Sequence, residues 1–235
     1  QVEARWPVAG QAYHALAVSR DGRRVALGAI GSGGLALVDA SSGAVLSRSA
    51  SPLGGDIDNL VFDADGSAVI ALDNKGNLIR FSLPDFKVLA QVQIHGGTAR
   101  GLALSPDGRI VASAGFDDRI VLSDAASLKL LRVLVYNNET ANSLAFSPGG
   151  DALAAAGFSP YTVRFWDPRS GNRLSDGPTA PSLVMSLAWS ADGQALAIGT
   201  EDSVVRIWRR VTTPPIPATK SPAGVPQAQV PAASR

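Results

Sequence analysis

The chain has 235 residues, of which 46% are hydrophobic and 17% charged, and its 21 basic residues nearly cancel its 20 acidic ones to leave a formal charge of +1. This balance argues against a surface built for nucleic acid or anionic lipid. The absence of cysteine excludes disulfides and thiolate metal sites, and no apolar run reaches the roughly 18 residues that span a bilayer.

The start of the sequence carries no recognisable secretory signal, which favours a cytoplasmic location. The first residue is Gln1 rather than methionine, so a processed periplasmic product and a fragment of a longer chain both stay open. The lack of cysteine does not decide the redox compartment, because cysteine-free proteins occur in oxidising compartments as well.

One pattern recurs five times along the chain: an apolar run, a tight polar turn ending in glycine, and a second apolar run. In its clearest copy, residues 102–108 are followed at once by the apolar residues 110–114. The turn glycines are separated by 44, 42, 42 and 43 residues, and they are Gly22, Gly66, Gly108, Gly150 and Gly193. A period this regular indicates one supersecondary unit copied in tandem.

Each unit is predicted to form four short strands, separated by turns rich in Asp, Asn, Ser, Pro and Gly. The predicted strands are 15–18, 25–27, 35–38 and 44–46; 60–62, 68–72, 78–81 and 87–90; 101–104, 110–114, 120–122 and 128–134; 143–146, 152–156, 162–166 and 173–174; and 186–189, 195–198 and 204–208. The fifth unit therefore lacks a fourth strand.

The two ends of the chain differ from the repeats. A strand candidate at residues 2–6 has the spacing of a missing fourth strand, because Arg5 lies 11 residues before Leu16 and the same separation links the third and fourth units. Docking this strand onto the last sheet would close the units into a ring and remove exposed sheet edges. Residues 211–235 hold six prolines and no periodicity, so we expect a domain over 1–210 followed by a disordered tail or linker.

The units resemble the repeats of WD40 β-propellers over roughly residues 2–210. Ser105-Pro106-Asp107-Gly108 looks like that family's turn between first and second strands, and Phe165-Trp166-Asp167 looks like its signature at the end of the third strand. The resemblance implies an all-β propeller of four-stranded blades, five of which are visible, with the N-terminal strand closing the last blade. A true five-bladed ring, a fragment of a larger ring and completion by a second copy are all open.

The resemblance also implies a structural brace. In the family, a histidine before the first strand, a serine or threonine in the second, an aspartate before the third and the signature tryptophan form a hydrogen-bonded chain. The residues here that match parts of this pattern are His95, Ser113, Asp117, Trp166, Asp167, Asp202 and Trp208. No unit carries all four members, since Ser123 stands at the tryptophan position of the third unit and Ala180 at the histidine position of the fifth.

A chemically mixed set of residues lies two positions before each first-strand leucine. In the family, residues at this position ring the mouth of the central channel and contact partners. We expect a partner-binding face there, together with residues of the turns between second and third strands, against the simpler interpretation of a solvated rim. The expected partner-binding residues are His14, Asp58, Arg100, Phe116, Asn142, Tyr161, Met185 and Glu201.

Other motifs indicate no chemistry. The run Asp63-Ala64-Asp65-Gly66 lacks the length and closing glutamate of a calcium loop, and Gly31-Ser32-Gly33-Gly34 lacks the spacing of a phosphate-binding loop. Only two histidines are present, 81 residues apart, and no serine stands in the Gly-x-Ser-x-Gly pattern of a nucleophile elbow. Asn138-Glu139-Thr140 matches a glycosylation acceptor, which matters only in a secreted eukaryotic protein.

The sequence thus predicts a non-catalytic protein–protein interaction scaffold that binds a peptide or partner domain on one face of the propeller. The alternative is a sensing or regulatory propeller of a larger multidomain enzyme, joined through the proline-rich segment. We expect no catalytic residue, metal or cofactor, and no nucleic-acid, membrane or small-molecule partner.

Overall fold

The computed structural model describes residues 12–31, 34–49, 55–135, 140–158 and 161–209. These residues form 19 β-strands and no helix. None of them therefore belongs to a helix that could cross a bilayer. The strand expected at 2–6, the tail expected at 211–235 and most of the Asn138-Glu139-Thr140 motif lie outside the described residues.

The strands fall into five antiparallel sheets, numbered here as blades 1 to 5 in chain order. Blade 1 holds β1 Tyr13–Val18, β2 Arg24–Ala29, β3 Leu35–Asp39 and β4 Val45–Ser49; blade 2 holds β5 Ile57–Phe62, β6 Ala68–Asp73, β7 Asn77–Ser82 and β8 Val88–Gln93. Blade 3 holds β9 Ala99–Leu104, β10 Ile110–Gly115, β11 Arg119–Asp124 and β12 Leu130–Val135; blade 4 holds β13 Ala141–Phe146, β14 Leu153–Gly157, β15 Thr162–Trp166 and β16 Arg173–Thr179. Blade 5 holds β17 Val184–Trp189, β18 Ala195–Thr200 and β19 Val205–Arg209.

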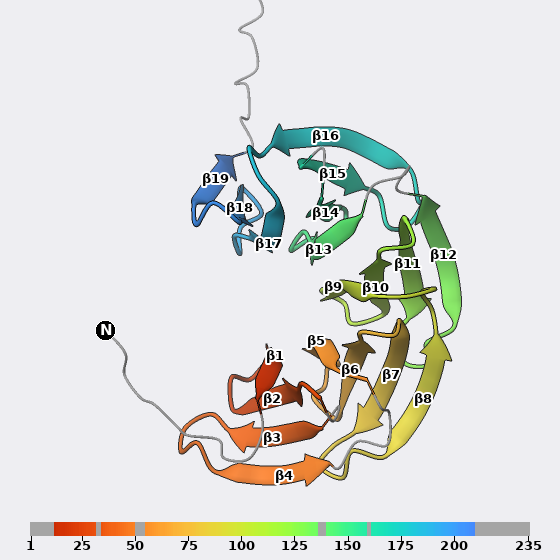
Figure 1. The fold of residues 1–235 in the computed structure, drawn as a ribbon, viewed down its shortest axis with the longest axis vertical. Helices are drawn as coiled ribbons and strands as arrows, with labels where there is room; N and C mark the ends of the chain where they lie inside the picture. Colours follow the sequence, from red (N-terminus) through yellow and green to blue (C-terminus); the bar gives the residue numbers. More distant parts are fainter. Residues whose placement is uncertain (1–11, 32–33, 50–54, 136–139, 159–160, 210–235) are drawn as a thin grey trace, which may run out of the picture.

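Every strand predicted within the described residues overlaps an observed strand, and blade 5 has three strands, as expected. The blades stand radially, with the first strand of each at the centre and the fourth at the rim (Figure 1). The largest difference is β16, which extends to Thr179 where the sequence indicated only residues 173–174.

The turn between first and second strands is built in the same way in four of the five blades. In blade 3 the Ser105 Oγ accepts a hydrogen bond from the Ile110 amide at 2.9 Å and donates one to Asp107 at 2.6 Å. Gly108 completes the turn with a φ of 73°, a left-handed conformation that glycine adopts without strain. Because the Ser105 hydroxyl and the Arg109 amide donate to it, the pKa of the Asp107 carboxyl lies below its usual value. Ser19, Ser147 and Ser190 hold the other three turns.

The core lies between blades. We call the face of a blade that contacts the next blade along the chain its forward face, and the opposite face its rear face. On the forward face of blade 3, Ile120 and Leu122 pack against Leu144 and Phe146 on the rear face of blade 4, and all four side chains are buried. Each fully buried side chain of this size contributes roughly 1.5–3 kcal/mol to folding, so contacts between neighbouring blades hold the sheets in their radial order.

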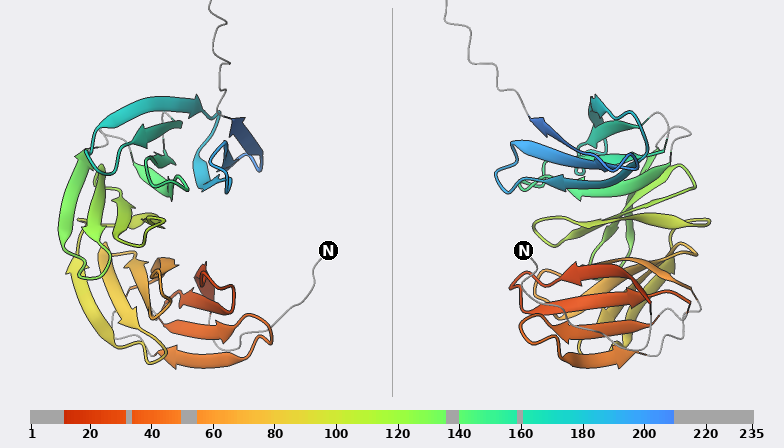
Figure 2. Two further views of the ribbon diagram at one scale, coloured as in Figure 1. Left: turned by 180° about the vertical axis from the view of Figure 1, so that it is seen from behind. Right: turned by 60° about the vertical axis from the view of Figure 1, so that its left-hand side comes forward.

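The five blades form an open arc. Neighbouring blades contact each other through their first strands, β1 with β5, β5 with β9, β9 with β13 and β13 with β17. Blades 1 and 5 stand on opposite sides of an opening (Figure 2). Closure of five blades into a ring is thus not shown, and its expected agent, the strand at residues 2–6, lies outside the described residues.

Replacing Phe146 by alanine should lower the free energy of unfolding by about 3–5 kcal/mol, because it removes a buried ring from the interface between blades 3 and 4. Urea denaturation followed by circular dichroism measures the change. Leu131→Ala, on the exposed side of β12, serves as the control and should change stability by less than about 0.5 kcal/mol. Equal losses in the two variants would contradict the placement of the core between blades.

Candidate functional site

Each first strand begins with a β-bulge, and the extra residue of each bulge belongs to the mixed set found in the sequence. In blade 3, Ala99 pairs with Gly115 and Gly101 with Ala114, which leaves Arg100 without an opposite residue. The equivalent shift of register occurs in the other four blades. The bulged residues are His14, Asp58, Arg100, Asn142 and Met185.

The bulge explains why the side chains at these positions do not join the packed core as the other side chains of the strand do. In a regular strand, side chains two residues apart share a face, so Arg100 would lie with Leu102 in the packed core between blades. An extra residue bends the strand and redirects its own side chain. Arg100 is accordingly exposed whereas Leu102 is buried. The five bulges thus place variable side chains at one end of the inner strands.

Three of these side chains, His14, Asp58 and Arg100, have ionisable groups and lie on the neighbouring blades 1, 2 and 3. The His14 Nδ1 lies 3.5 Å from the Asp58 Oδ1, and the Asp58 side chain is mostly buried. Burial raises the pKa of the Asp58 carboxyl, while the nearby charges of Arg100 and His14 act in the opposite direction. The Asn59 Nδ2 donates to the Arg100 carbonyl at 3.0 Å and so ties the second bulge to the third.

An aromatic pair continues this surface from blade 3 to blade 4. The Arg100 guanidinium lies over the Phe116 ring, 5.7 Å from its centroid, and Phe116 meets Phe158 edge to face with centroids 5.3 Å apart. Both rings are exposed although each is large and apolar. We call His14, Asp58, Arg100, Phe116 and Phe158 the mouth cluster. Its composition, an arginine beside exposed aromatic rings, is typical of residues that dominate binding energy at protein interfaces.

Phe158 was missed in the sequence, although the repeat carries the signal. Gly157-Phe158 follows Gly115-Phe116 at the 42-residue step that also separates the two turn glycines of these units. Both phenylalanines follow the last residue of a second strand, Gly115 in β10 and Gly157 in β14. Aligning the ends of the second strands would have found it.

The other expected partner-binding residues lie near the same end but outside the mouth cluster. The buried Asn142 donates from its Nδ2 to the Val184 carbonyl at 3.4 Å, and its Oδ1 has no hydrogen-bond partner among the described residues. Tyr161 is half-buried and packs against the core between blades 4 and 5. Met185 and Glu201 are exposed on blade 5.

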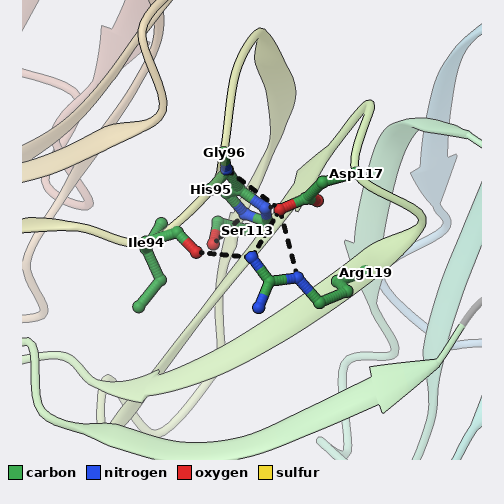
Figure 3. A network of polar contacts seen from close by, with 6 residues as sticks. All are labelled: Ile94, His95, Gly96, Ser113, Asp117 and Arg119. Carbon is green, nitrogen blue, oxygen red and sulfur yellow. Dashed lines mark hydrogen bonds and ion pairs between the residues drawn. The ribbon is translucent and has the colours of Figure 1, made fainter.

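Blade 3 contains a hydrogen-bonded chain at the position of the expected brace (Figure 3). The His95 Nε2 lies 2.9 Å from the Ser113 Oγ, and its Nδ1 lies 2.9 Å from the Asp117 Oδ1. The Gly96 amide donates to Asp117 at 3.1 Å. Because Asp117 follows Phe116 directly, this chain fixes the turn that carries Phe116 against the segment leading into Arg100.

The electrostatics of the brace favour a neutral histidine. Burial lowers the pKa of His95 more than the neighbouring Asp117 carboxylate raises it. Partial burial acts to raise the pKa of Asp117, but donors from Arg119, His95 and Gly96 together bring it below its usual value. A neutral ring beside an ionised carboxylate donates from Nδ1 to Asp117 and accepts from the Ser113 hydroxyl at Nε2.

Arg119 is a further residue of the blade 3 brace, and the sequence did not indicate it. Its Nη2 and Nε donate to the Asp117 Oδ2 at 2.6 and 3.1 Å, so the carboxylate is held from two sides. Ser123, which stands in place of the tryptophan, is buried and its hydroxyl has no hydrogen-bond partner among the described residues. The arginine thus supplies a clamp in a blade that lacks the tryptophan.

The remaining residues expected in braces lie elsewhere. Asp167 accepts hydrogen bonds from the Arg169 amide and the Ser170 hydroxyl in the turn that leads to β16. Asp202 is paired with Arg206 at 2.7 Å, and both lie on blade 5. Trp166 is buried in the core between blades 3 and 4. The half-buried Trp208 packs against Phe165, with the two ring centroids 5.5 Å apart. Among the described residues, the structure brings only His95, Ser113 and Asp117 into one brace.

A cavity of about 580 Å³ lies at the opposite end of the inner strands. All five blades contribute to its lining, mainly through the turns between first and second strands, and its lining residues include Ala17, Leu60, Leu104, Pro148 and Ala191. The lining at this end of the inner strands is therefore mostly apolar, in contrast to the polar and aromatic side chains of the mouth cluster at the other end.

The two carboxylates of the run Asp63-Ala64-Asp65-Gly66 accept hydrogen bonds from protein donors. Asp63 accepts from the Ala68 amide at 3.0 Å and is paired with Arg80 at 2.8 Å, in the turn between β5 and β6. Within the described ranges, no group of three or more His, Cys, Asp or Glu side chains is arranged to hold a metal ion.

The repeats match a known family model in three consecutive segments, at residues 86–124, 128–167 and 172–209. The model describes the WD domain, G-beta repeat. Each segment runs from the fourth strand of one blade through the third strand of the next, as from β8 to β11. A comparison with curated protein sequences found no significant match.

The lowered pKa of His95 predicts that stability falls as the pH drops below about 6.5, the ordinary histidine value. Folded His95 binds a proton less readily than unfolded His95, so its contribution is complete above that value and is lost toward the folded pKa. Urea titrations at pH values between about 7 and 5 measure the free energy of unfolding. This free energy should fall less for His95→Gln than for the wild type, and both proteins keep His14. Equal losses would contradict a buried neutral His95.

Proposed function

The chain belongs to the WD40-repeat family, and we propose that it is a scaffold that binds a protein partner through the mouth cluster. WD40 repeats generally serve as protein-interaction scaffolds, and proteins built from them are typically non-catalytic. The fold accounts for such a role, because rigid blades hold loop and bulge residues in fixed positions.

The single observation that carries the choice of face is the row of contacts in which Arg100 lies over Phe116 and Phe116 meets Phe158. Two exposed aromatic rings and a guanidinium meet across two blades, and the brace of blade 3 fixes the turn that carries one of them. Rigid aromatic anchors lose little conformational entropy on binding. His14 and Asp58 add polar groups beside them.

This chemistry favours a particular kind of partner. The aromatic pair suits an apolar side chain, and Arg100 suits a carboxylate or carbonyl oxygen next to it. A peptide or the loop of a partner domain can supply both groups. Asn142, Tyr161, Met185 and Glu201, on blades 4 and 5, would extend the contact toward the opening of the arc.

The alternative function, a regulatory propeller of a larger enzyme, depends on the proline-rich residues 211–235. The division of the chain into a propeller at 1–210 and a tail or linker at 211–235 stays a prediction, since that segment lies outside the described residues. A coding sequence that continues from Arg235 into a catalytic domain would favour this alternative.

Arg100→Ala and Phe116→Ala should each weaken partner binding tenfold or more, because truncation of such anchors costs about 1.4 kcal/mol or more. The partner is first captured from a lysate of the source cells, identified by mass spectrometry and then titrated as a purified protein. Neither variant should change the thermal midpoint by more than a few degrees.

Arg109→Ala is the matched control, since Arg109 is an exposed arginine of the same blade beside the turn at the opposite end of β9. It should leave partner affinity unchanged. If Arg109→Ala weakens binding and Arg100→Ala does not, the partner uses the opposite face and the mouth cluster is not the binding site.

A further inference from the structure

The five turns between first and second strands each place one equivalent residue around the cavity of about 580 Å³ at the end opposite the mouth cluster, which we call the turn-side cavity. In every turn this residue directly follows the Ser or Asp whose side chain accepts the closing amide hydrogen bond. The five residues are exposed and line the cavity: Arg20, Ala64, Pro106, Pro148 and Ala191. Because every blade contributes the same turn position, the cavity is a product of the repeat itself.

The walls of the turn-side cavity are preformed. Four of the five turn positions hold alanine or proline, whose side chains have no rotamer freedom to lose on binding. Leu104 and Val61, both half-buried, add apolar surface from the inner strands. The volume of about 580 Å³ lies within the range of ligand-binding pockets, about 300–1,000 Å³. An apolar group that enters this cavity meets fixed walls, which keeps the entropic cost of binding low.

One charged side chain of the lining has no partner of opposite charge. Arg20 and Asp63 are the charged residues among the described residues that line the turn-side cavity. Asp63 is paired with Arg80 at 2.8 Å. Arg20 is exposed, and its guanidinium makes no hydrogen bond or ion pair with another described residue. An unpaired guanidinium at the edge of an apolar cavity favours a ligand that carries a carboxylate.

A groove of about 260 Å³ adjoins the cavity at Arg20, between the turns of blades 1 and 2. A second arginine lines it, since the Arg24 guanidinium lies over the Phe62 ring, 5.7 Å from its centroid, and has no salt bridge with a described residue. Asp21 and Asp65 also line the groove, and each accepts hydrogen bonds within its own turn. The two arginines therefore lie where a carboxylate at the edge of the cavity would meet them.

The shape and charge of these surfaces limit the occupant. The lining consists largely of exposed turn residues, so a small molecule would stay in contact with water, whereas pockets for small ligands bury most of the ligand surface. A peptide continues past the cavity and along the groove, and Arg20 lines both. Residues 211–235 of this chain include Lys220 and Arg235 but no acidic residue, so they supply no carboxylate side chain.

We propose that the turn-side cavity is a second binding site, which takes a peptide segment of a partner protein with apolar residues next to an acidic one. The apolar side chains pack against Ala64, Leu104 and Pro106, and the adjacent Asp or Glu pairs with Arg20. An extended chain advances about 3.3 Å per residue, so the acidic residue stands within one or two positions of the apolar ones. The mouth cluster takes no part in this contact, so the second site can hold or fail independently of the proposed function.

The test is the selection of a displayed library of random peptides on the full 235-residue chain. The library is first depleted on an Ala64→Trp variant, whose indole fills part of the turn-side cavity, so that peptides bound elsewhere are removed. The peptides that remain should carry Asp or Glu next to apolar residues. One of them, synthesised and titrated against purified protein, should bind Arg20→Gln roughly tenfold or more weakly than the wild type. Arg23→Gln is the matched control, since Arg23 is an exposed arginine of the same turn that does not line the cavity. Arg23→Gln and Arg100→Ala should both bind the peptide like the wild type.

Four results would overturn the proposal. The first is that no peptide remains after depletion, and the second is that the remaining peptides lack acidic residues, which for proline-rich peptides would indicate residues 211–235 of this chain as the occupant. The third is an equal change of affinity in Arg20→Gln and Arg23→Gln. The fourth is loss of binding in Arg100→Ala, which would place the peptide at the mouth cluster. All these variants alter exposed side chains, so circular dichroism melts should match the wild type; if Ala64→Trp melts differently, Ala191→Trp on blade 5 takes its place in the depletion.

Discussion

A blade of this protein has two apolar faces, and in blades 2, 3 and 4 both faces are buried against neighbouring blades. The forward face of blade 3 and the rear face of blade 4 show the consequence, since Leu122 and Phe146 become part of one core only when the two sheets stack. Four of the five core clusters combine residues of two neighbouring blades, and only the small cluster of Leu27, Ala36 and Val38 lies within one blade, so most of the hydrophobic contribution to folding arises at the interfaces. Stability in such repeat structures is close to a sum of nearest-neighbour interactions, so blades 2, 3 and 4 gain from two sides and blades 1 and 5 from one.

Because the regular strands are used in packing, the candidate binding residues lie where the strands are interrupted by bulges and turns. The side chains of a regular inner strand pack between blades. The bulge of each first strand redirects one side chain toward the end of the inner strands where the mouth cluster lies. In blade 3 the bulged Arg100 meets Phe116, and the brace from His95 to Asp117 holds the turn of that phenylalanine. A structural histidine therefore lies directly behind a pair of candidate binding residues.

Much of this architecture could be predicted from the sequence because it repeats. The 42- to 44-residue period, the glycine turns and the short apolar runs predict 19 strands within the described residues, and each overlaps an observed strand. The spacing before each leucine found the five mouth positions without showing that they were bulges, since a bulge appears only in strand pairing. Arg119 was missed because its role depends on a side-chain contact with Asp117, two residues away, which the spacing of the repeat does not show. Phe158 holds the repeat position of Phe116, and only the contact between the two rings gives it its importance. Ring closure could not be predicted from matched chain ends, because it depends on curvature set by the packing of all blades.

The dependence of each blade on its neighbours can be measured most directly by hydrogen exchange at low protein concentration. Amides of β10 and β11 in blade 3, which is flanked on both sides, should exchange slowest, and those of β18 and β19 in blade 5 should exchange fastest. Equal protection in the two blades, or greater protection in blade 5, would contradict a fold whose stability resides in the interfaces between blades.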